Sequence, residues 1–164
     1  MSGDVLVAGI GNIFLGDDAF GVEVVNRLMQ RPLPGNVCAV DYGIRSFDLA
    51  YALMEDWELV VLVDALPQGG EPGTLYVFEP EMPNGDFAPN LDAHTMNPVA
   101  VLQLVKALGG EPRRMVIVGC EPATVEPSAD GNMGLSGPVE AALDEAVRMV
   151  RDIVARFRGE AAAA

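Results

Sequence analysis

Three carboxylates and one imidazole stand where the sequence could bring them together around a metal ion. Asp17 and Asp18 end a glycine-rich stretch, Asp64 directly follows the apolar run 59–63, and His94 is the only histidine. Two carboxylates and an imidazole suit divalent nickel, zinc, manganese or iron, and three protein ligands leave positions open for water or substrate. We therefore predict that Asp18, Asp64 and His94 are both the metal ligands and the catalytic residues.

Each of these residues also has a purely structural interpretation. Aspartate is favoured in the first turn of a helix, and we assign that capping role to Asp17 rather than Asp18. The helix dipole would lower the pKa of both acids and keep them ionised, as a metal ligand must be. Asp64 could cap the loop at 67–70, and His94 could be a packed or surface histidine.

Short β-branched runs alternate with helical patterns along the chain, which indicates parallel strands joined by helices. We predict one three-layer α/β/α domain over residues 1–159, with a frayed tail at 160–164. Its sheet is expected to be twisted, five-stranded and mostly parallel, with one antiparallel edge strand. The expected strands are 5–10, 37–40, 59–63, 74–78 and 115–118, and the expected helices lie near 20–29, 46–53, 98–108 and 139–157, with Ser46 and Asn97 as caps.

The order of the strands decides whether the candidate ligands meet. Ligands of open α/β sheets bind outside the carboxyl ends of the strands, where the strand order reverses. If the first and third strands are neighbours, Asp18 and Asp64 flank that crevice. Asp41 and Glu121, at the ends of two other strands, are secondary candidates that could instead cap a turn or face solvent. Two long loops, 80–95 and 122–136, are expected to be functional or mobile.

Composition restricts the partners and the compartment. The formal net charge is −14, which repels nucleic acid and anionic lipid and attracts a cation or a basic segment. No secretory signal is visible, and no apolar stretch approaches the ~20 residues of a membrane span. Cys38 and Cys120 lie in apolar runs without a CxxC pattern, so we expect two reduced core thiols in a cytoplasmic protein without membrane insertion.

Other chemistry finds little support in the motifs. The turn after the first strand opens as Gly-x-Gly, but Phe14 stands where a dinucleotide site needs its third glycine. Asp17 and Asp18 would also repel a pyrophosphate there, so we expect no nucleotide cofactor. The sequence contains neither a P-loop nor a Gly-x-Ser-x-Gly elbow.

Several motifs together resemble those of the hydrogenase maturation endopeptidases, which trim the large-subunit precursor of nickel–iron hydrogenases. By position, the metal-binding residues of that family correspond to Asp18, Asp64 and His94, while Ala19 departs from the glycine that is more common there. The resemblance spans roughly residues 5–155. Its motifs are Gly9-Ile10-Gly11-Asn12, Gly16-Asp17-Asp18-Ala19-Phe20-Gly21, Val63-Asp64-Ala65, Glu71-Pro72-Gly73-Thr74, Val118-Gly119-Cys120-Glu121-Pro122 and Gly134-Leu135-Ser136.

The resemblance implies an α/β fold and a metal-dependent endopeptidase whose partner is a nickel-loaded precursor. The divalent metal would be the nickel of that precursor rather than a permanent cofactor, and cleavage would remove a short C-terminal extension. Water would be activated either by the metal or by a carboxylate acting as general base. A non-catalytic nickel-binding chaperone or recognition module for hydrogenase assembly is the alternative that we keep.

Overall fold

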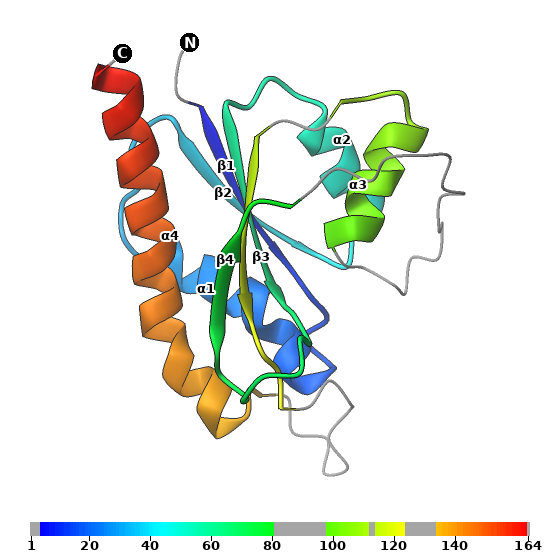
Figure 1. Ribbon diagram of the computed structural model, residues 1–164, viewed down its shortest axis with the longest axis vertical. Helices are drawn as coiled ribbons and strands as arrows, with labels where there is room; N and C mark the ends of the chain where they lie inside the picture. Colours follow the sequence, from blue (N-terminus) through cyan, green and yellow to red (C-terminus); the bar gives the residue numbers. More distant parts are fainter. Residues whose placement is uncertain (1–3, 81–97, 112–113, 124–133, 164) are drawn as a thin grey trace.

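The structure is a computed structural model that describes residues 4–80, 98–111, 114–123 and 134–163. Its five strands form a single sheet in the order β2-β1-β3-β5-β4, in which only β4 runs antiparallel to its neighbour (Figure 1). The strands are β1 (Val5–Ile10), β2 (Val37–Gly43), β3 (Leu59–Ala65), β4 (Leu75–Phe78) and β5 (Met115–Cys120).

Helices cover both faces of this sheet, which confirms the predicted three-layer α/β fold with its antiparallel edge strand. One layer contains α1 and α4 and the other contains α2 and α3 (Figure 1). The helices are η1 (Gly16–Ala19, a short 3-10 helix), α1 (Phe20–Leu28), α2 (Ser46–Leu53), α3 (Pro98–Ala107) and α4 (Gly137–Ala163).

Alternation along the central strands explains why the sheet is buried on both sides. In β1, Val5 and Val7 belong to the core under α1 and α4, whereas Leu6 and Ala8 belong to the core under α2 and α3. Every residue of β1 is buried, and β3 and β5 follow the same pattern. Continuous apolar strands are what a sheet covered on both faces requires.

The strand order reverses between β1 and β3. From β1 the chain crosses to β2 on one side and then returns to β3 on the other, so the carboxyl ends of β1 and β3 form the topological switch point. The last paired residues there are Gly9 and Val63. We expected Asp18 and Asp64 to lie near one another if the first and third strands are neighbours. The strand order meets this condition.

Glycine lets α1 begin directly on these strand ends. A Cβ atom added at Gly21 would lie 2.1 Å from the carbonyl oxygen of Val63 and 2.4 Å from that of Ile10. Such distances are well inside van der Waals contact, so only glycine permits this close approach. The helix that follows the acid pair is thereby fixed against both strands of the crevice.

Several details differ from the expectations. Strand β2 is only partly buried because it is an edge strand, and Cys38 is exposed rather than in the core, while Cys120 is buried. Ser46 is the first residue of α2 and not its cap, since Arg45 occupies that position without a side-chain cap bond. The last helix continues to Ala163, so it includes residues 160–163 of the predicted tail.

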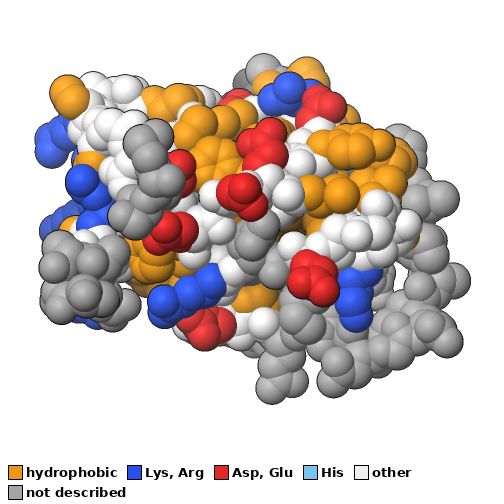
Figure 2. Space-filling model, turned by 90° about the horizontal axis from the view of Figure 1, so that it is seen from above, with side chains coloured by type: hydrophobic (Ala, Val, Ile, Leu, Met, Phe, Trp, Pro, Cys, Tyr) orange, Lys and Arg blue, Asp and Glu red, His pale blue; other side chains and the backbone are white. Residues whose placement is uncertain are grey.

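Charged side chains are mixed on the end of the molecule where the two termini lie. Figure 2 shows acidic, basic and hydrophobic side chains interspersed on this face. Within the described ranges, no helix combines the length and apolar character needed to cross a membrane.

Candidate functional site

The loop after β1 folds around the carboxylate of Asp18. The N–H of Asn12 donates to Oδ2 of Asp18 at 2.8 Å, and the N–H of Phe14 donates to Oδ1 of Asn12 at 2.9 Å. Gly11 has a φ of 146°, and a Cβ atom there would lie 1.8 Å from the carbonyl oxygen of Asp18. Because one N–H of this loop already binds Asp18, the turn presents a carboxylate where a nucleotide site presents free amides.

Asp64 is the sixth residue of β3 and lies inside the strand, not directly after it as we expected. Its register partner in β5 is Gly119, which has no side chain. The carboxyl group is almost inaccessible, with 2% of the residue exposed. A buried acid at the end of a central strand carries a large desolvation cost unless something compensates its charge.

Electrostatics show that the two carboxylates interact. Burial raises the pKa of Asp64 well above its usual value, and the negative charge of Asp18 raises it further, against a smaller opposing effect of the Ala65 N–H. Burial also raises the pKa of Asp18, partly offset by the hydrogen bond from Asn12. Our expectation that the helix dipole would lower the pKa of Asp18 is therefore wrong, because burial outweighs it.

This pair of acids suits a cation. Asp64 is buried and Asp18 half-buried, and two such neighbouring carboxylates both become easier to ionise when a divalent ion lies between them. Oxygen donors of this kind accept nickel, zinc, manganese or iron, particularly when an imidazole completes the set. The donor atoms of Asp18 and Asp64 thus fit a divalent metal, although two ligands alone are too few to hold it firmly.

The predicted third ligand, His94, lies outside the described residues. In the parts of the chain that are described, no group of three or more histidine, cysteine, aspartate or glutamate side chains could hold a metal ion. Helix α3, which follows the segment containing His94, runs opposite to β5, so its N-terminal end lies toward the carboxyl ends of the strands (Figure 1). The role of His94 remains a prediction.

Asp17 has a role that sequence reasoning missed. Its carboxylate is fully buried and accepts hydrogen bonds from the N–H of Ala123 at 2.7 Å, the N–H of Ser136 at 2.7 Å and the hydroxyl of Ser136 at 2.8 Å. No side-chain cap bond is present at η1. Asp17 therefore joins Ala123 and Ser136, which lie on the two sides of the segment 124–133, to the turn that follows β1.

Glu121 is a second buried carboxylate that organises a loop. It accepts hydrogen bonds from the N–H of Gln68 at 2.9 Å, the N–H of Gly70 at 2.7 Å and the hydroxyl of Tyr76 at 2.8 Å. Burial raises the pKa of Glu121, but these hydrogen bonds together outweigh it and lower the pKa. We expected Glu121 to line the crevice or face solvent, whereas it is 4% exposed and fixes the loop that follows Asp64.

Asp41 lines a groove rather than capping a turn with its side chain. Its carbonyl oxygen accepts a hydrogen bond from Arg45 at 2.6 Å. The groove has a volume of about 430 Å³ and includes Ala19, the neighbour of Asp18. It follows the seam between α1 and α4, and its other lining residues are Ile13, Val22, Glu23, Asn26, Arg27, Gly134, Leu135, Glu140 and Leu143.

Comparison with known proteins points to one family. A family model described as HycI, hydrogenase maturation protease, matches residues 22–153. The hydrogenase 2 maturation protease of Escherichia coli is 30% identical over 147 residues, which cover 89% of this chain and 87% of that protein. The coenzyme F420 hydrogenase subunit delta of Methanothermobacter thermautotrophicus is 33% identical over 155 residues, covering 91% and 93% of the two chains.

A solved structure agrees with these sequence matches. The hydrogenase maturating endopeptidase HybD of E. coli superposes with a TM-score of 0.74 at 29% sequence identity. The superposition covers 93% of this chain and 92% of that one.

Proposed function

This chain belongs to the hydrogenase maturation protease family, and on that premise we propose that it cleaves a C-terminal extension from the nickel-loaded large-subunit precursor of a nickel–iron hydrogenase. The precursor's nickel is part of the substrate, and Asp18, Asp64 and His94 are the residues that contact it. The predicted family is confirmed, whereas the metal dependence belongs to the proposal.

The observation that carries this proposal is the acid pair at the switch point, in which Asp64 is buried and Asp18 half-buried. Asp64 is 2% exposed and feels the charge of Asp18. Such a pair is costly for the free protein and favourable once a divalent ion is present. On this proposal the protease supplies carboxylate ligands without a metal, and the nickel-loaded precursor supplies the metal.

Because the metal comes with the substrate, nickel insertion into the precursor would precede its cleavage. A precursor without nickel offers no cation to the two carboxylates, so it is positioned poorly at the crevice. A loaded precursor places the scissile peptide beside a metal and a carboxylate, and either can activate water. A carboxylate that is ionised beside the metal can accept a proton from the attacking water as general base.

The experiment that tests the function compares two forms of one substrate. Purified protein is incubated with nickel-loaded and nickel-free large-subunit precursor, and both products are weighed by mass spectrometry. We expect loss of a C-terminal fragment from the loaded precursor alone. Equal cleavage of both forms would show that cleavage does not depend on nickel. Cleavage of neither form would refute the proposed activity on that precursor.

The non-catalytic alternative has one specific observation in its favour. The relative from M. thermautotrophicus is named as a hydrogenase subunit and not as a protease. A recognition module would bind the loaded precursor through the same residues and leave its mass unchanged. Binding without a mass shift is therefore the result that selects this alternative.

We place the activity in the cytoplasm. Both cysteines are free thiols, and one of them, Cys38, is exposed. Exposed free thiols persist in a reducing compartment.

A further inference from the structure

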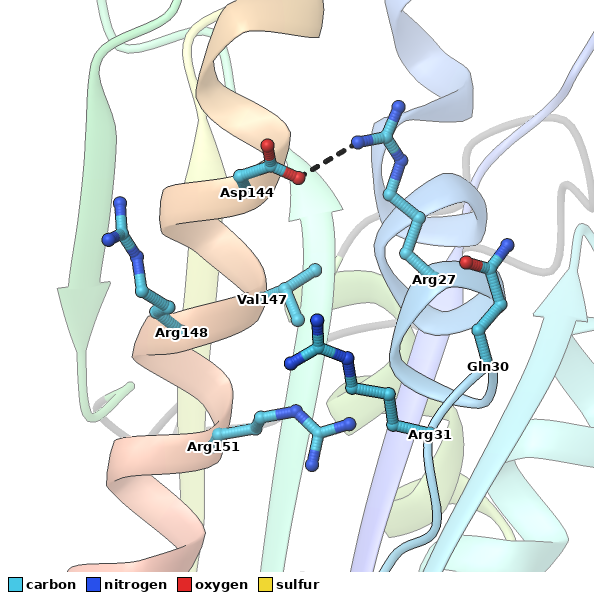
Figure 3. Close-up of a pocket in the computed structure, with 7 residues that line it drawn as sticks. All are labelled: Arg27, Gln30, Arg31, Asp144, Val147, Arg148 and Arg151. Carbon is cyan, nitrogen blue, oxygen red and sulfur yellow. Dashed lines mark hydrogen bonds and ion pairs between the residues drawn. The ribbon is translucent and has the colours of Figure 1, made fainter.

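We propose that a cationic groove between α1 and α4 binds an acidic segment of the protein on which this chain acts. This arginine groove has a volume of about 620 Å³ and lies on the seam between the two helices. Its lining residues are Arg27, Gln30, Arg31, Asp144, Val147, Arg148 and Arg151 (Figure 3).

The concentration of positive charge in the arginine groove is unusual for this chain. Four of its ten cationic side chains line the groove together with a single carboxylate, although the whole chain has 24 acidic residues. Random placement on so acidic a protein would surround each arginine with carboxylates. Guanidinium groups offer planar pairs of donors that match carboxylates, so an acidic side chain is the natural ligand.

Two of the arginines are already held in place. Arg27 forms an ion pair with Asp144 at 3.0 Å, and Arg151 donates to the carbonyl oxygen of Leu28 at 3.1 Å. Leu28 is the last residue of α1, so Arg151 also compensates the negative end of that helix. These contacts explain Arg27 and Arg151 without any ligand, and they order the side chains that a ligand would meet.

The same explanation does not extend to Arg31 and Arg148. In Figure 3 the guanidinium group of Arg31 reaches between the helices beside that of Arg151. Within the described parts of the chain, no hydrogen bond or ion pair is recorded for Arg31. Arg148 pairs with Glu145 on the same exposed turn of α4, at 2.6 Å, and its side chain is 71% exposed. Arg31 is therefore directly available to a partner, and Arg148 becomes available when a partner's carboxylate replaces Glu145 in this solvent-screened ion pair.

The arginine groove shares one lining residue, Arg27, with the groove that includes Asp41 and Ala19, the residue after Asp18. Arg27 lines both of them, one turn along α1 from Glu23, which lines the groove near Asp18. The nine residues of α1 span about 13 Å, so the arginines lie roughly one helix length from the crevice. A protein that reaches the acid pair with one segment can thus contact the arginines with another. In this respect the inference rests on the proposed function.

The net charge decides between classes of anionic partner. Nucleic acids and anionic bilayers extend far beyond a groove of this size and would meet the remaining negative charge of a chain at −14. A short acidic stretch of a folded protein contacts the arginines without that repulsion. The groove therefore fits an acidic protein segment that binds remotely from the cleavage site.

The first test measures binding of an acidic peptide to the arginine groove without the precursor. Binding of a fluorescein-labelled deca-glutamate peptide is followed by anisotropy for the wild type and for Arg31→Glu, Arg148→Glu and Arg156→Glu. Arg156 is an exposed arginine of α4 outside the groove, so its variant is a control with the same change of charge. We expect about tenfold weaker binding for Arg31→Glu and Arg148→Glu and less than about twofold for Arg156→Glu.

Equal effects of all three variants, or no binding to the wild type, would overturn the proposal. Single-stranded DNA, phosphatidylglycerol vesicles and inorganic phosphate are measured in parallel. Binding of any of them more tightly than the peptide, in a manner that depends on Arg31, would assign the groove to another anion and also refute it.

The second test connects the groove with the substrate. In precursor processing, Arg31→Glu should raise KM severalfold and leave kcat unchanged, while Arg156→Glu changes neither. An unchanged KM would show that the precursor does not use the groove. If the wild type fails to cut any precursor, the proposed function fails, and the peptide measurement still decides whether the groove binds an acidic segment.

Discussion

At the scale of single residues, the molecule contains four carboxylates with different roles at one edge of the sheet. Asp18 and Asp64 interact across the crevice, and both have a raised pKa. Asp17 and Glu121 are both buried, and each accepts three or more hydrogen bonds. Hydrogen bonds lower the pKa of Glu121, whereas burial raises the pKa of Asp18 and of Asp64.

The first prediction concerns the charge of Asp64. Because its pKa in the folded state lies above the unfolded value, its ionisation destabilises the fold as pH rises through and beyond the unfolded pKa, near 4. Asp64→Asn removes that penalty. In metal-free buffer we measure the melting temperature of Asp64→Asn minus that of the wild type. We expect this difference to be more positive at pH 7 than at pH 4.

Thermal unfolding followed by circular dichroism measures this difference. Glu58→Gln, a substitution at an exposed acid, serves as control and should show a nearly constant difference between the two pH values. If the difference for Asp64→Asn is also constant between pH 4 and pH 7, Asp64 does not ionise at a cost and the electrostatic account of the pair is incorrect.

The second prediction separates Asp17 from Asp18. Asp17→Asn replaces one acceptor oxygen by a donor that faces the N–H groups of Ala123 or Ser136. A buried donor without a partner costs about 1–3 kcal/mol, so the free energy of unfolding should fall by that amount. Urea denaturation gives the value. Ser136→Ala, which removes only a hydroxyl, should cost less, and the reverse order would contradict the role of Asp17 as a tie between distant segments.

At the scale of the elements, the start of α1 is held against β1 and β3 by backbone contact. Gly21→Ala would place a methyl group 2.1 Å from the carbonyl oxygen of Val63. We expect a loss of about 1–3 kcal/mol in the free energy of unfolding, because the helix must shift away from the strands. Precursor cleavage should fall as well, since Asp18 lies on the turn before this helix.

Gly35→Ala is the matched control for this variant. Gly35 has open space around its Cβ position, so the same substitution should leave stability within about 0.5 kcal/mol of the wild type. Chemical denaturation of both variants under one set of conditions makes the comparison. Equal stability of the two variants would show that α1 has room to move at the crevice.

The loop after β3 depends on Glu121. Its pKa is lowered by hydrogen bonds from Gly70, Gln68 and Tyr76 that outweigh burial, so the stability it contributes is present above the unfolded pKa and is lost as pH falls through the folded pKa. In Glu121→Gln we expect faster amide exchange at Gln68 and Gly70, measured by hydrogen–deuterium exchange at pH 7. Glu71→Gln, at an exposed residue of the same loop, should leave those amides protected.

The elements that the sequence predicted best are those with a local signal. Apolar runs placed β1 and β3, and their position placed Asp64 at the carboxyl edge. Cys38 was misplaced because the burial of a strand depends on whether it lies at the edge of the sheet, and β2 is an edge strand. Strand order is a property of the whole fold and leaves no trace in the periodicity of one strand.

The roles of Asp17 and Glu121 could not be predicted for a related reason. The partners of Asp17 at Ser136 lie 119 positions away, and the partner of Glu121 at Gln68 lies 53 positions away. Neither spacing forms a local motif, and a lone acid near a turn is equally compatible with a cap. The pairing of Asp18 with Asp64 was accessible because the rule for open α/β sheets links the two strand ends without knowledge of side-chain contacts.

At the scale of the whole molecule, charge is separated along the seam of α1 and α4. The groove near the crevice is lined by Glu23, Asp41 and Glu140, and the arginine groove shares Arg27 with it. A substrate with a metal and an acidic segment would find complementary charge at each end of this surface. On the two proposals made above, one end of this surface would recognise the metal and the other the protein that carries it.

The measurement that tests the central claim most directly is cleavage of nickel-loaded precursor by variants of the three proposed ligands. Asp18→Asn, Asp64→Asn and His94→Ala are compared with Asp41→Asn, which alters an acid at the same edge outside the proposed site. Product is quantified by mass spectrometry over time. We expect a loss of about 10²-fold or more for each ligand variant and little change for Asp41→Asn, and undiminished processing by the three ligand variants would contradict the account.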